Sequence, residues 1–243
     1  MKKNLLILIV LSSIFYCCGQ VSKSEPAILS KDKEAPKISD VTGSQKSAET
    51  SIDKYIDTKY LYVDDKGKLI TIQNGLPRGG SRYTDPNGKE YAYAIFWSRI
   101  INETDNPLEL KIDFLDSYEV PYFPDKHYKI LVPLDSMTTG KVDLFNYGLT
   151  DLGAFLDNSI NKPSSLKRTI SPKDSSGFYF VKLGLVSEGP YGSGDILRTG
   201  LSLNGENLFY RVSVYNSVEP PIIIGEKEID CGKINLKKLK LQK

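Results

Sequence analysis

The feature that most constrains the fold of this 243-residue chain is a strict alternation of apolar and charged side chains in its middle. In residues 108–114, LELKIDF, four apolar residues alternate with three charged ones. Only a β-strand with one face on a core and the other in water accommodates this period of two. Residues 90–101, EYAYAIFWSRII, place apolar side chains on both faces and therefore predict an interior strand.

Other segments repeat the strand pattern and are separated by residues that favour tight turns. These are KGK at 66–68, DPNG at 85–88 and NG at 204–205. One helix is expected at about 150–160, where leucines recur at helical spacing, and Pro163 should end it. Short strands with this punctuation predict an all-β antiparallel sandwich. The further expected strands are 59–65, 69–73, 128–134, 177–186, 207–215, 221–229 and 233–241.

Residues 90–114 form the clearest unit, two predicted strands joined by NETDNP at 102–107. We expect them to pair as a hairpin. The arrangement of strand, Asn-x-Thr-x-x-Pro-Leu and strand resembles hairpins in immunoglobulin-like sandwiches of secreted bacterial proteins. The resemblance implies an immunoglobulin-like antiparallel β-sandwich, which we place at residues 52–243. It implies nothing about activity, because such sandwiches host many functions.

The first 17 residues have the composition of an export signal. Lys2 and Lys3 precede an apolar run at 5–15. This run of about 11 residues is shorter than the roughly 20 that a membrane-spanning helix needs. Residues 1–17 are therefore predicted to be a signal peptide that is removed on maturation.

Two cysteines, Cys17 and Cys18, end the apolar run. The arrangement resembles the lipobox of Bacteroidota-type bacterial lipoproteins, in which the first mature residue is an acylated cysteine. Cys18 is favoured because the small Cys17 precedes it, whereas the alternative, Cys17, follows the bulky Tyr16. The resemblance implies a palmitate-type anchor on Cys18. Because Gly19 follows, and not the aspartate of inner-membrane retention signals, it also implies the cell outer membrane, with the periplasmic or surface face left open.

An ordinary secreted protein whose signal ends in cysteines is the alternative to a lipoprotein.

In the lipoprotein interpretation, residues 18–51 form a tether that begins with the lipidated cysteine. Its Ser, Lys, Glu and Pro content offers too little apolar surface to offset the entropy of ordering the chain, so we expect disorder. A flexible chain of about 33 residues reaches roughly 30 Å.

The charge balance and the cysteine count exclude several classes of protein. The chain has 32 Lys and Arg against 30 Asp and Glu, and loss of Lys2 and Lys3 leaves 30 against 30. A neutral mature protein argues against a general nucleic-acid binder. With Cys17 and Cys18 assigned to the signal and the anchor, Cys231 has no partner for a disulfide and is expected to be a small buried hydrophobe.

No cofactor or metal motif is found in the sequence. His127 is the only histidine, which excludes zinc sites built on several histidines, and it is expected in a polar loop before the strand at 128–134. SSLK at 164–167 matches the S-x-x-K motif, but its context differs from that of penicillin-recognising enzymes. A carboxylate pair of the kind that hydrolyses glycosides cannot be located, because its spacing is spatial.

Aromatic residues give a further indication. SYEVPYFPDKHY at 117–128 and SEGPYGSGD at 187–195 are the candidate binding loops, since tyrosines bury large areas at low entropic cost. The competing interpretation places the tyrosines at the rim of the β core. The candidate binding residues are Tyr118, Tyr122, Phe123, His127 and Tyr191.

Two surface features complete the sequence analysis. Asp135-Ser136-Met137 resembles the O-glycosylation sequence of Bacteroidota envelope proteins, which makes Ser136 a candidate site. Lys233 begins a lysine-rich C-terminus, interpreted as protection of a final edge strand. The sequence thus predicts a lipid-anchored lipoprotein whose sandwich is a non-catalytic binding or structural module for a protein or glycan. An envelope hydrolase with a carboxylate site is the alternative.

Overall fold

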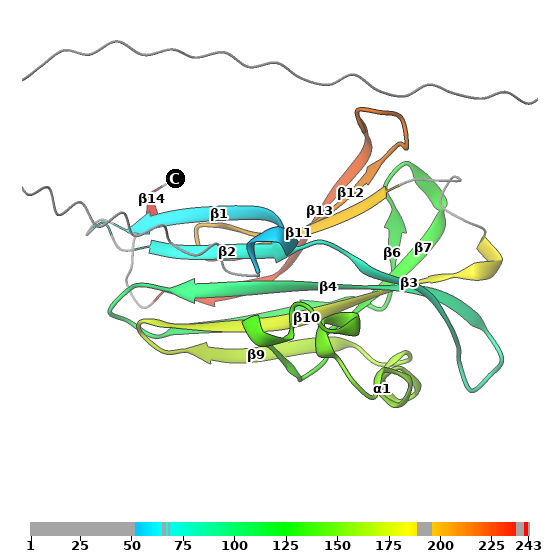
Figure 1. The fold of residues 1–243 in the computed structure, drawn as a ribbon, viewed down its shortest axis with the longest axis horizontal. Coiled ribbons are helices and arrows are strands. Elements are labelled where there is room, and N and C mark those ends of the chain that lie inside the picture. Colours follow the sequence, from blue (N-terminus) through cyan, green and yellow to red (C-terminus); the bar gives the residue numbers. More distant parts are fainter. Residues whose placement is uncertain (1–51, 65–66, 68, 189–195, 237–240, 243) are drawn as a thin grey trace, which may run out of the picture. The chain divides into compact units, whose positions relative to one another are not determined.

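The computed structural model describes residues 52–64, 67, 69–188, 196–236 and 241–242. Cys17, Cys18 and the tether lie outside the described residues. The described chain forms two antiparallel β-sheets and one short helix (Figure 1). The expected all-β antiparallel sandwich is confirmed by its two packed sheets. No helix among the described residues is long and apolar enough to cross a membrane.

The larger sheet, sheet A, has nine strands within the described residues. Its order is β14 (Leu241–Gln242), β1 (Ile56–Asp64), β2 (Leu69–Gly75), β4 (Glu90–Asn102), β10 (Asp174–Leu185), β7 (Phe123–Leu131) and β6 (Tyr118–Val120), with β3 (Arg78–Thr84) on β4 and β8 (Ser136–Met137) on β10. Sheet B has the order β11 (Ile196–Asn204), β12 (Asn207–Tyr215), β13 (Ile223–Asn235), β5 (Leu108–Phe114) and β9 (Ser164–Ile170). The 3₁₀ turns are Asp53–Tyr55, Thr139–Lys141, Phe145–Gly148 and Val186–Glu188.

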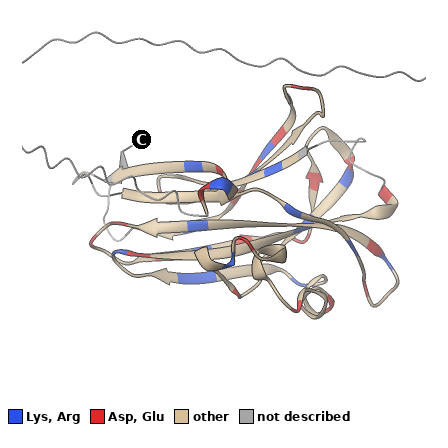
Figure 2. Ribbon diagram, viewed as in Figure 1, with Lys and Arg blue, Asp and Glu red and all other residues tan. Residues whose placement is uncertain are grey.

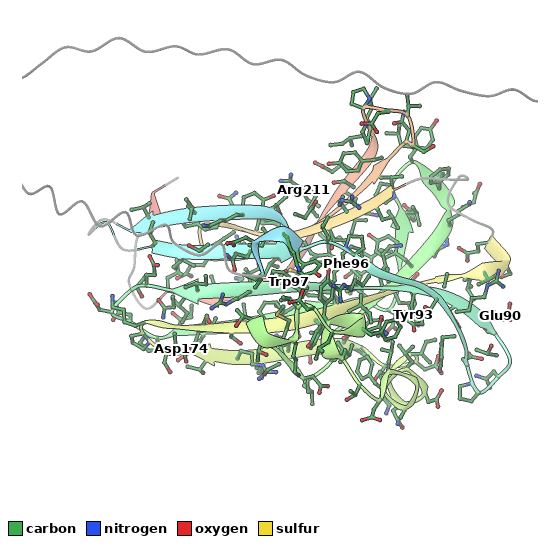
Figure 3. The ribbon with its side chains drawn as sticks, in the orientation of Figure 1. Glu90, Tyr93, Phe96, Trp97, Asp174 and Arg211 are labelled. Carbon is green, nitrogen blue, oxygen red and sulfur yellow. The ribbon has the colours of Figure 1, made fainter. Side chains whose placement is uncertain are left out.

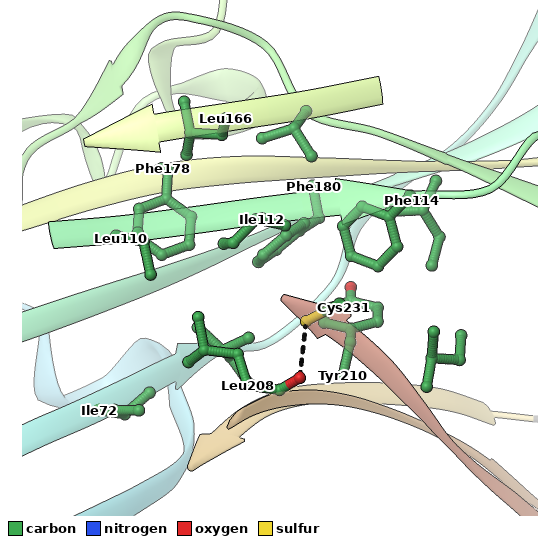
Figure 4. Packing of buried hydrophobic residues seen from close by; sticks show 14 of the residues in the cluster. Ile72, Leu110, Ile112, Phe114, Leu166, Phe178, Phe180, Leu208, Tyr210 and Cys231 are labelled. Carbon is green, nitrogen blue, oxygen red and sulfur yellow. Dashed lines mark hydrogen bonds between the residues drawn. The ribbon is translucent and has the colours of Figure 1, made fainter. Parts of the chain in front are cut away.

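The main core lies between the two sheets. Phe178 and Phe180 of β10 meet Phe114 of β5 and Tyr210 of β12, and the Phe180 and Tyr210 rings are 4.6 Å apart (Figure 4). Cys231 is buried among them, as expected from the sequence, and its thiol donates to the Leu208 carbonyl oxygen at 3.4 Å. Burial raises the pKa of this thiol to about 12, which keeps it protonated and unreactive.

A second core covers the opposite face of sheet A. Neighbouring residues Phe96 and Trp97 of β4 belong to opposite faces, Phe96 to the main core and Trp97 to the second core. The helix α1 (Leu152–Ser159) packs Leu156 into the second core, so the predicted helix is confirmed. These two cores explain why the interior strand of the sequence analysis is apolar on both faces.

The hairpin expected from residues 90–114 is wrong. The strand β4 pairs within sheet A, whereas β5 pairs with β13 and β9 of sheet B, so the segment between them crosses from one sheet to the other. Asn102 stabilises the crossing, because its amide donates to the carbonyl oxygens of Asn106, Ile170 and Ser171 at 2.8–3.2 Å. The Thr104 hydroxyl donates to Asn102 Oδ1 at 2.6 Å. Asn102 and Thr104 therefore stabilise the crossing loop through their side-chain hydrogen bonds.

The separate strands expected at 221–229 and 233–241 are also wrong. The strand β13 runs through Ile223–Asn235 and contains a bulge at Cys231, where Leu208 is opposite Gly232 and Phe209 is opposite Asp230. Gly232 has a φ of +139°, and a Cβ there would lie 2.1 Å from the Lys111 carbonyl oxygen. The bulge needs glycine at this position.

Candidate functional site

A groove follows the line where the edge of sheet A lies against sheet B. Two hollows, of about 450 and 70 Å³, share Tyr60 of β1 and Arg211 of β12 and so form one groove, here called the seam groove. Figure 3 labels Arg211 beside the start of β1. One end of the groove is walled by Tyr62 and Phe209, and the other by Tyr215.

The strand register explains how these side chains meet. Tyr60 and Tyr62 are opposite Ile72 and Ile70, so they face the core, but β1 is near the sheet edge and leaves both rings half-buried. Arg211 lies between the core residues Tyr210 and Val212 of β12, so its side chain points to the outer face of sheet B. The groove therefore combines aromatic rings from one sheet with polar groups from the outer face of the other.

The inner side of the groove is held by Asn74 of β2. This side chain is 1% exposed and makes four hydrogen bonds. Its amide nitrogen donates to Thr58 Oγ1 and to the Leu201 carbonyl oxygen, both at 3.0 Å. Its oxygen accepts from the Leu201 N–H at 2.8 Å and from the Ser98 hydroxyl at 2.6 Å. Asn74 thereby joins sheet A to the backbone of β11.

A second bond closes the same edge. The Leu203 N–H of β11 donates to the Tyr62 hydroxyl at 2.8 Å. The backbone N–H groups of Leu201 and Leu203 point away from the partner strand β12, on the edge where an incoming strand would need free backbone groups. Because side chains already occupy these groups, this part of the edge does not template a peptide strand.

The charges of the groove are paired. Asp57 contacts Arg198 with 3.2 Å between the carboxylate oxygen and Nε, and Glu228 contacts Arg211 Nη2 at 3.2 Å. Glu226 accepts from the Ser213 hydroxyl at 2.8 Å. With Lys59, the lining has three cations and three carboxylates. The groove is formally neutral.

Arg211 keeps most of its hydrogen-bonding capacity. A guanidinium has five N–H donors, and among the described residues only the bond to Glu228 meets hydrogen-bond geometry. The contact of Nε with Glu226 is 3.7 Å long, which is too far for a hydrogen bond. The side chain is 36% exposed, so its outer donors are accessible to a ligand in the groove.

Burial shifts two pKa values in the groove. It raises the pKa of the Asp57 carboxyl above its ordinary value, and the neighbouring Arg198 opposes this shift. It also raises the pKa of Tyr62, which keeps the hydroxyl protonated at neutral pH. Tyr62 can therefore accept from Leu203 while its own proton remains available as a donor.

The residues predicted from sequence as a binding loop lie on an edge hairpin of sheet A, formed by β6 and β7. Tyr118 is buried, and its ring stacks on Tyr128 at 5.7 Å, as the rim-of-core interpretation expects. Tyr122 is 66% exposed and contacts Phe123 edge-on at 5.1 Å. His127 is exposed on β7 itself, so the expected loop before residue 128 is wrong: the strand begins at Phe123.

The other candidate loop meets this hairpin at its described start, where the His127 backbone N–H donates to Glu188 Oε2 at 2.6 Å. Tyr191 lies outside the described residues, as does most of the loop at 187–195. Ser136 is exposed on β8, which pairs with the same edge of β10 as β7 but nearer the start of β10. The tip between β12 and β13 lies near Tyr122, because a Cβ on Gly225 would be 2.8 Å from Tyr122 Cβ. The exposed apolar residues of that tip are Val218, Ile222 and Ile223.

The sequence analysis missed the seam groove. Its residues come from three segments, around 57–62, 198–204 and 209–228, and no linear motif joins them. The available signal was the position of Tyr60 and Tyr62 two residues apart on the first strand of the sandwich. That spacing places two aromatic rings on one face at a sheet edge.

Among the described residues, no group of three or more His, Cys, Asp and Glu side chains is arranged to hold a metal ion. No protein-family model matches this chain, and no curated protein or solved structure matches it.

Proposed function

We propose that the chain is a lipid-anchored envelope lipoprotein whose sandwich binds a neutral oligosaccharide in the seam groove, without catalysis. The observation that carries this proposal is a neutral groove with aromatic walls and an arginine that has free donors. Aromatic rings bury the apolar C–H faces of sugars, and fixed polar groups bond their hydroxyls. Tyr60, Tyr62 and Phe209 supply the rings, and Arg211 and Ser202 supply polar groups.

The balance of charge favours a neutral sugar over an anion. Three cations and three carboxylates line the groove, and the two arginines each contact a carboxylate. An anionic ligand would gain little from paired arginines and would meet the carboxylates. Sugar hydroxyls both donate and accept, so they suit a groove that offers both partners side by side.

Two alternatives receive less support. A peptide added to the edge of β11 would lack the backbone groups that Asn74 and Tyr62 occupy. The alternative of a hydrolase needs a general acid that holds its proton near neutral pH. Asp57 has a raised pKa, but its contact with Arg198 favours the ionised form.

The proposal is tested by affinity electrophoresis in gels containing dextran, mannan or xylan. We expect at least one polymer to retard the protein, and Arg211→Met to reduce the retardation about tenfold or more, since hydrogen bonds to charged groups contribute roughly 1.5–3 kcal/mol. Arg82→Met is the matched control, because Arg82 also contacts a glutamate, at 3.3 Å, but on β3. Retardation by none of the polymers, or equal loss in the control, contradicts the proposal. Release of reducing sugar would favour the hydrolase.

The anchor is tested separately by cell fractionation. Replacing Cys18 by Ser should move the protein from the membrane to the soluble fraction, because the acyl chains supply the membrane affinity. Cys17→Ser is the control and should leave the protein in the membrane fraction. Membrane retention of Cys18→Ser, or absence of acyl chains in the mass of the mature protein, contradicts the anchor.

A further inference from the structure

A polar row crosses all five strands of sheet B. Register pairs Asn204 with Asn207, Asn207 with Lys233, Lys233 with Lys111, and Lys111 with Lys167. All five residues are exposed on the outer face. With strands about 4.8 Å apart, the row spans roughly 19 Å and its three lysines roughly 10 Å. We call residues 233, 111 and 167 the lysine row.

The lysine row is poorly neutralised. Lys111 contacts Asp113 at 2.7 Å, but among the described residues neither Lys167 nor Lys233 forms an ion pair. A hollow of about 430 Å³ beside the row is lined by its three lysines and one carboxylate, Glu109. In Figure 2 the middle of β9, where Lys167 lies, is blue. Like charges directly opposite each other on neighbouring strands destabilise a sheet, so the arrangement has a cost that an anionic ligand would remove.

Protection of a sheet edge does not explain the row. Lysines guard edge strands against pairing, and Lys167 lies on the edge strand β9. Lys111 and Lys233, however, lie on β5 and β13, which have neighbours on both sides. The sequence-based interpretation of Lys233 as edge protection is therefore wrong for this residue.

The neighbouring rows indicate the shape of the ligand. Glu109 and Asp113 are exposed on the same strand and face as Lys111, one row to either side. A flat anionic surface such as a bilayer would meet these carboxylates together with the lysines. A linear anion that follows the row across the strands would avoid both.

We propose that the lysine row binds a linear acidic polysaccharide, with carboxylate or sulfate groups over Lys233, Lys111 and Lys167. The row ends at Asn207 and Asn204, whose amides suit uncharged sugar hydroxyls. A nucleic acid fits less well, because it would need aromatic stacking or a basic excess. Bases have no aromatic residue in this row to stack on, and the mature chain carries 30 basic against 30 acidic residues after loss of Lys2 and Lys3. This inference does not rest on oligosaccharide binding in the seam groove.

The experiment compares dextran sulfate with neutral dextran of the same length, using the full purified protein and isothermal titration or affinity electrophoresis. We expect dextran sulfate to bind more tightly, with an affinity that falls as salt is added. Lys167→Gln with Lys233→Gln should weaken this binding about tenfold or more. The matched control, Lys89→Gln with Lys162→Gln, removes the same charge from exposed positions outside the row and should have little effect.

Three results would overturn the inference. The first is equal weakening by both double variants, which means that net charge alone governs binding. The second is a preference for vesicles containing anionic lipid, or for a single-stranded oligonucleotide, over dextran sulfate. The third is no binding of dextran sulfate at low salt. Loss of dextran sulfate binding in Arg211→Met would instead place the anion in the seam groove, which separates this inference from the proposed function.

Discussion

The seam groove and the lysine row occupy the same outer face of sheet B, but opposite charges are paired in the groove and like charges are aligned in the row. In the groove, Arg211 is directly opposite Glu228, and the lining sums to zero. In the row, Lys111 is directly opposite lysines on both of its neighbours, and the hollow beside it has three lysines and one carboxylate. One sheet face therefore offers a neutral surface near β11 and a cationic surface near β9.

Strand register, and not composition, produces this difference. The outer face of this sheet carries Arg211 on β12, Glu226, Glu228, Asp230 and Lys233 on β13, and Glu109, Lys111 and Asp113 on β5. Whether a cation meets an anion or another cation depends on how far each strand is displaced along its neighbour. The bulge at Cys231 and Gly232 adds one residue to β13 between Glu228 and Lys233. On one side of the bulge the register pairs Arg211 with Glu228, and on the other side it aligns Lys233 with the other lysines of the row.

The largest expected effect comes from removing that bulge. Gly232→Ala should lower the free energy of unfolding by about 3 kcal/mol, because its Cβ would press on the Lys111 carbonyl oxygen and its φ is positive. In the fraction that folds, binding of dextran sulfate should weaken, whereas retardation by a neutral polymer should persist. Urea unfolding and affinity electrophoresis measure the two quantities.

Gly205→Ala is the control for Gly232→Ala. Gly205 also has a positive φ, +60°, but a Cβ there meets nothing within 4 Å. It should cost only about 1 kcal/mol, the strain of the backbone alone. If both variants cost the same, close approach at Gly232 does not hold the register. If Gly232→Ala weakens neutral and acidic polymers equally, the two surfaces are not distinct.

The sequence predicted the strands β5 and β12 of this face, but it missed β9, divided β13 in two and did not predict which strands are neighbours. Alternation in residues 108–114 correctly identified β5 as a strand with one wet face, and the NG at 204–205 correctly located the turn between β11 and β12. Alternation says which side chains face water and nothing about which strand lies beside them. For that reason the pairing of β4 with β5 was predicted wrongly, and neither the groove nor the row was predicted.

The aromatic candidates show the same limit. The pattern of Tyr118, Glu119 and Val120 alternates, which could have indicated that Tyr118 is buried in a short strand. Tyr122 follows in the turn and is exposed, with a φ of +71°. Composition alone could not separate these two tyrosines, because Tyr118 lies within the three-residue strand β6 and Tyr122 lies just after it, in the turn.

The next largest effect should come from opening the groove while leaving the row intact. Asn74→Ala leaves the N–H and carbonyl of Leu201 without partners inside the protein, and should lower the free energy of unfolding by about 2–3 kcal/mol. Loss of this link lets β11 move from β2, so retention by a neutral polymer should fall. Binding of dextran sulfate should be unchanged, since the lysines lie on β13, β5 and β9.

Ser98→Ala is the control for Asn74→Ala. It removes one hydrogen bond to Asn74 but leaves both bonds to Leu201, and should cost only about 1 kcal/mol. A loss of neutral-polymer binding in Ser98→Ala as large as that in Asn74→Ala would show that burial of a polar cluster, and not the link to β11, maintains the groove.

The smallest effect should come from pH, which converts the groove into a cationic surface. Because burial raises the pKa of Asp57, this carboxyl takes up a proton at a higher pH than an ordinary aspartate, and Arg198 then loses its counter-charge. The folded chain holds this proton more tightly than the unfolded chain, so the contribution to stability is present at low pH and is lost as pH rises through the folded pKa. In the Lys167→Gln, Lys233→Gln background, lowering the pH from 7 should therefore restore dextran sulfate binding as Asp57 takes up its proton, and Asp57→Asn should restore it several-fold at pH 7. Adding Arg198→Met should abolish the restored binding. Recovery that persists without Arg198 would mean that general protonation of the surface, and not the loss of one paired carboxylate, separates the two surfaces at neutral pH.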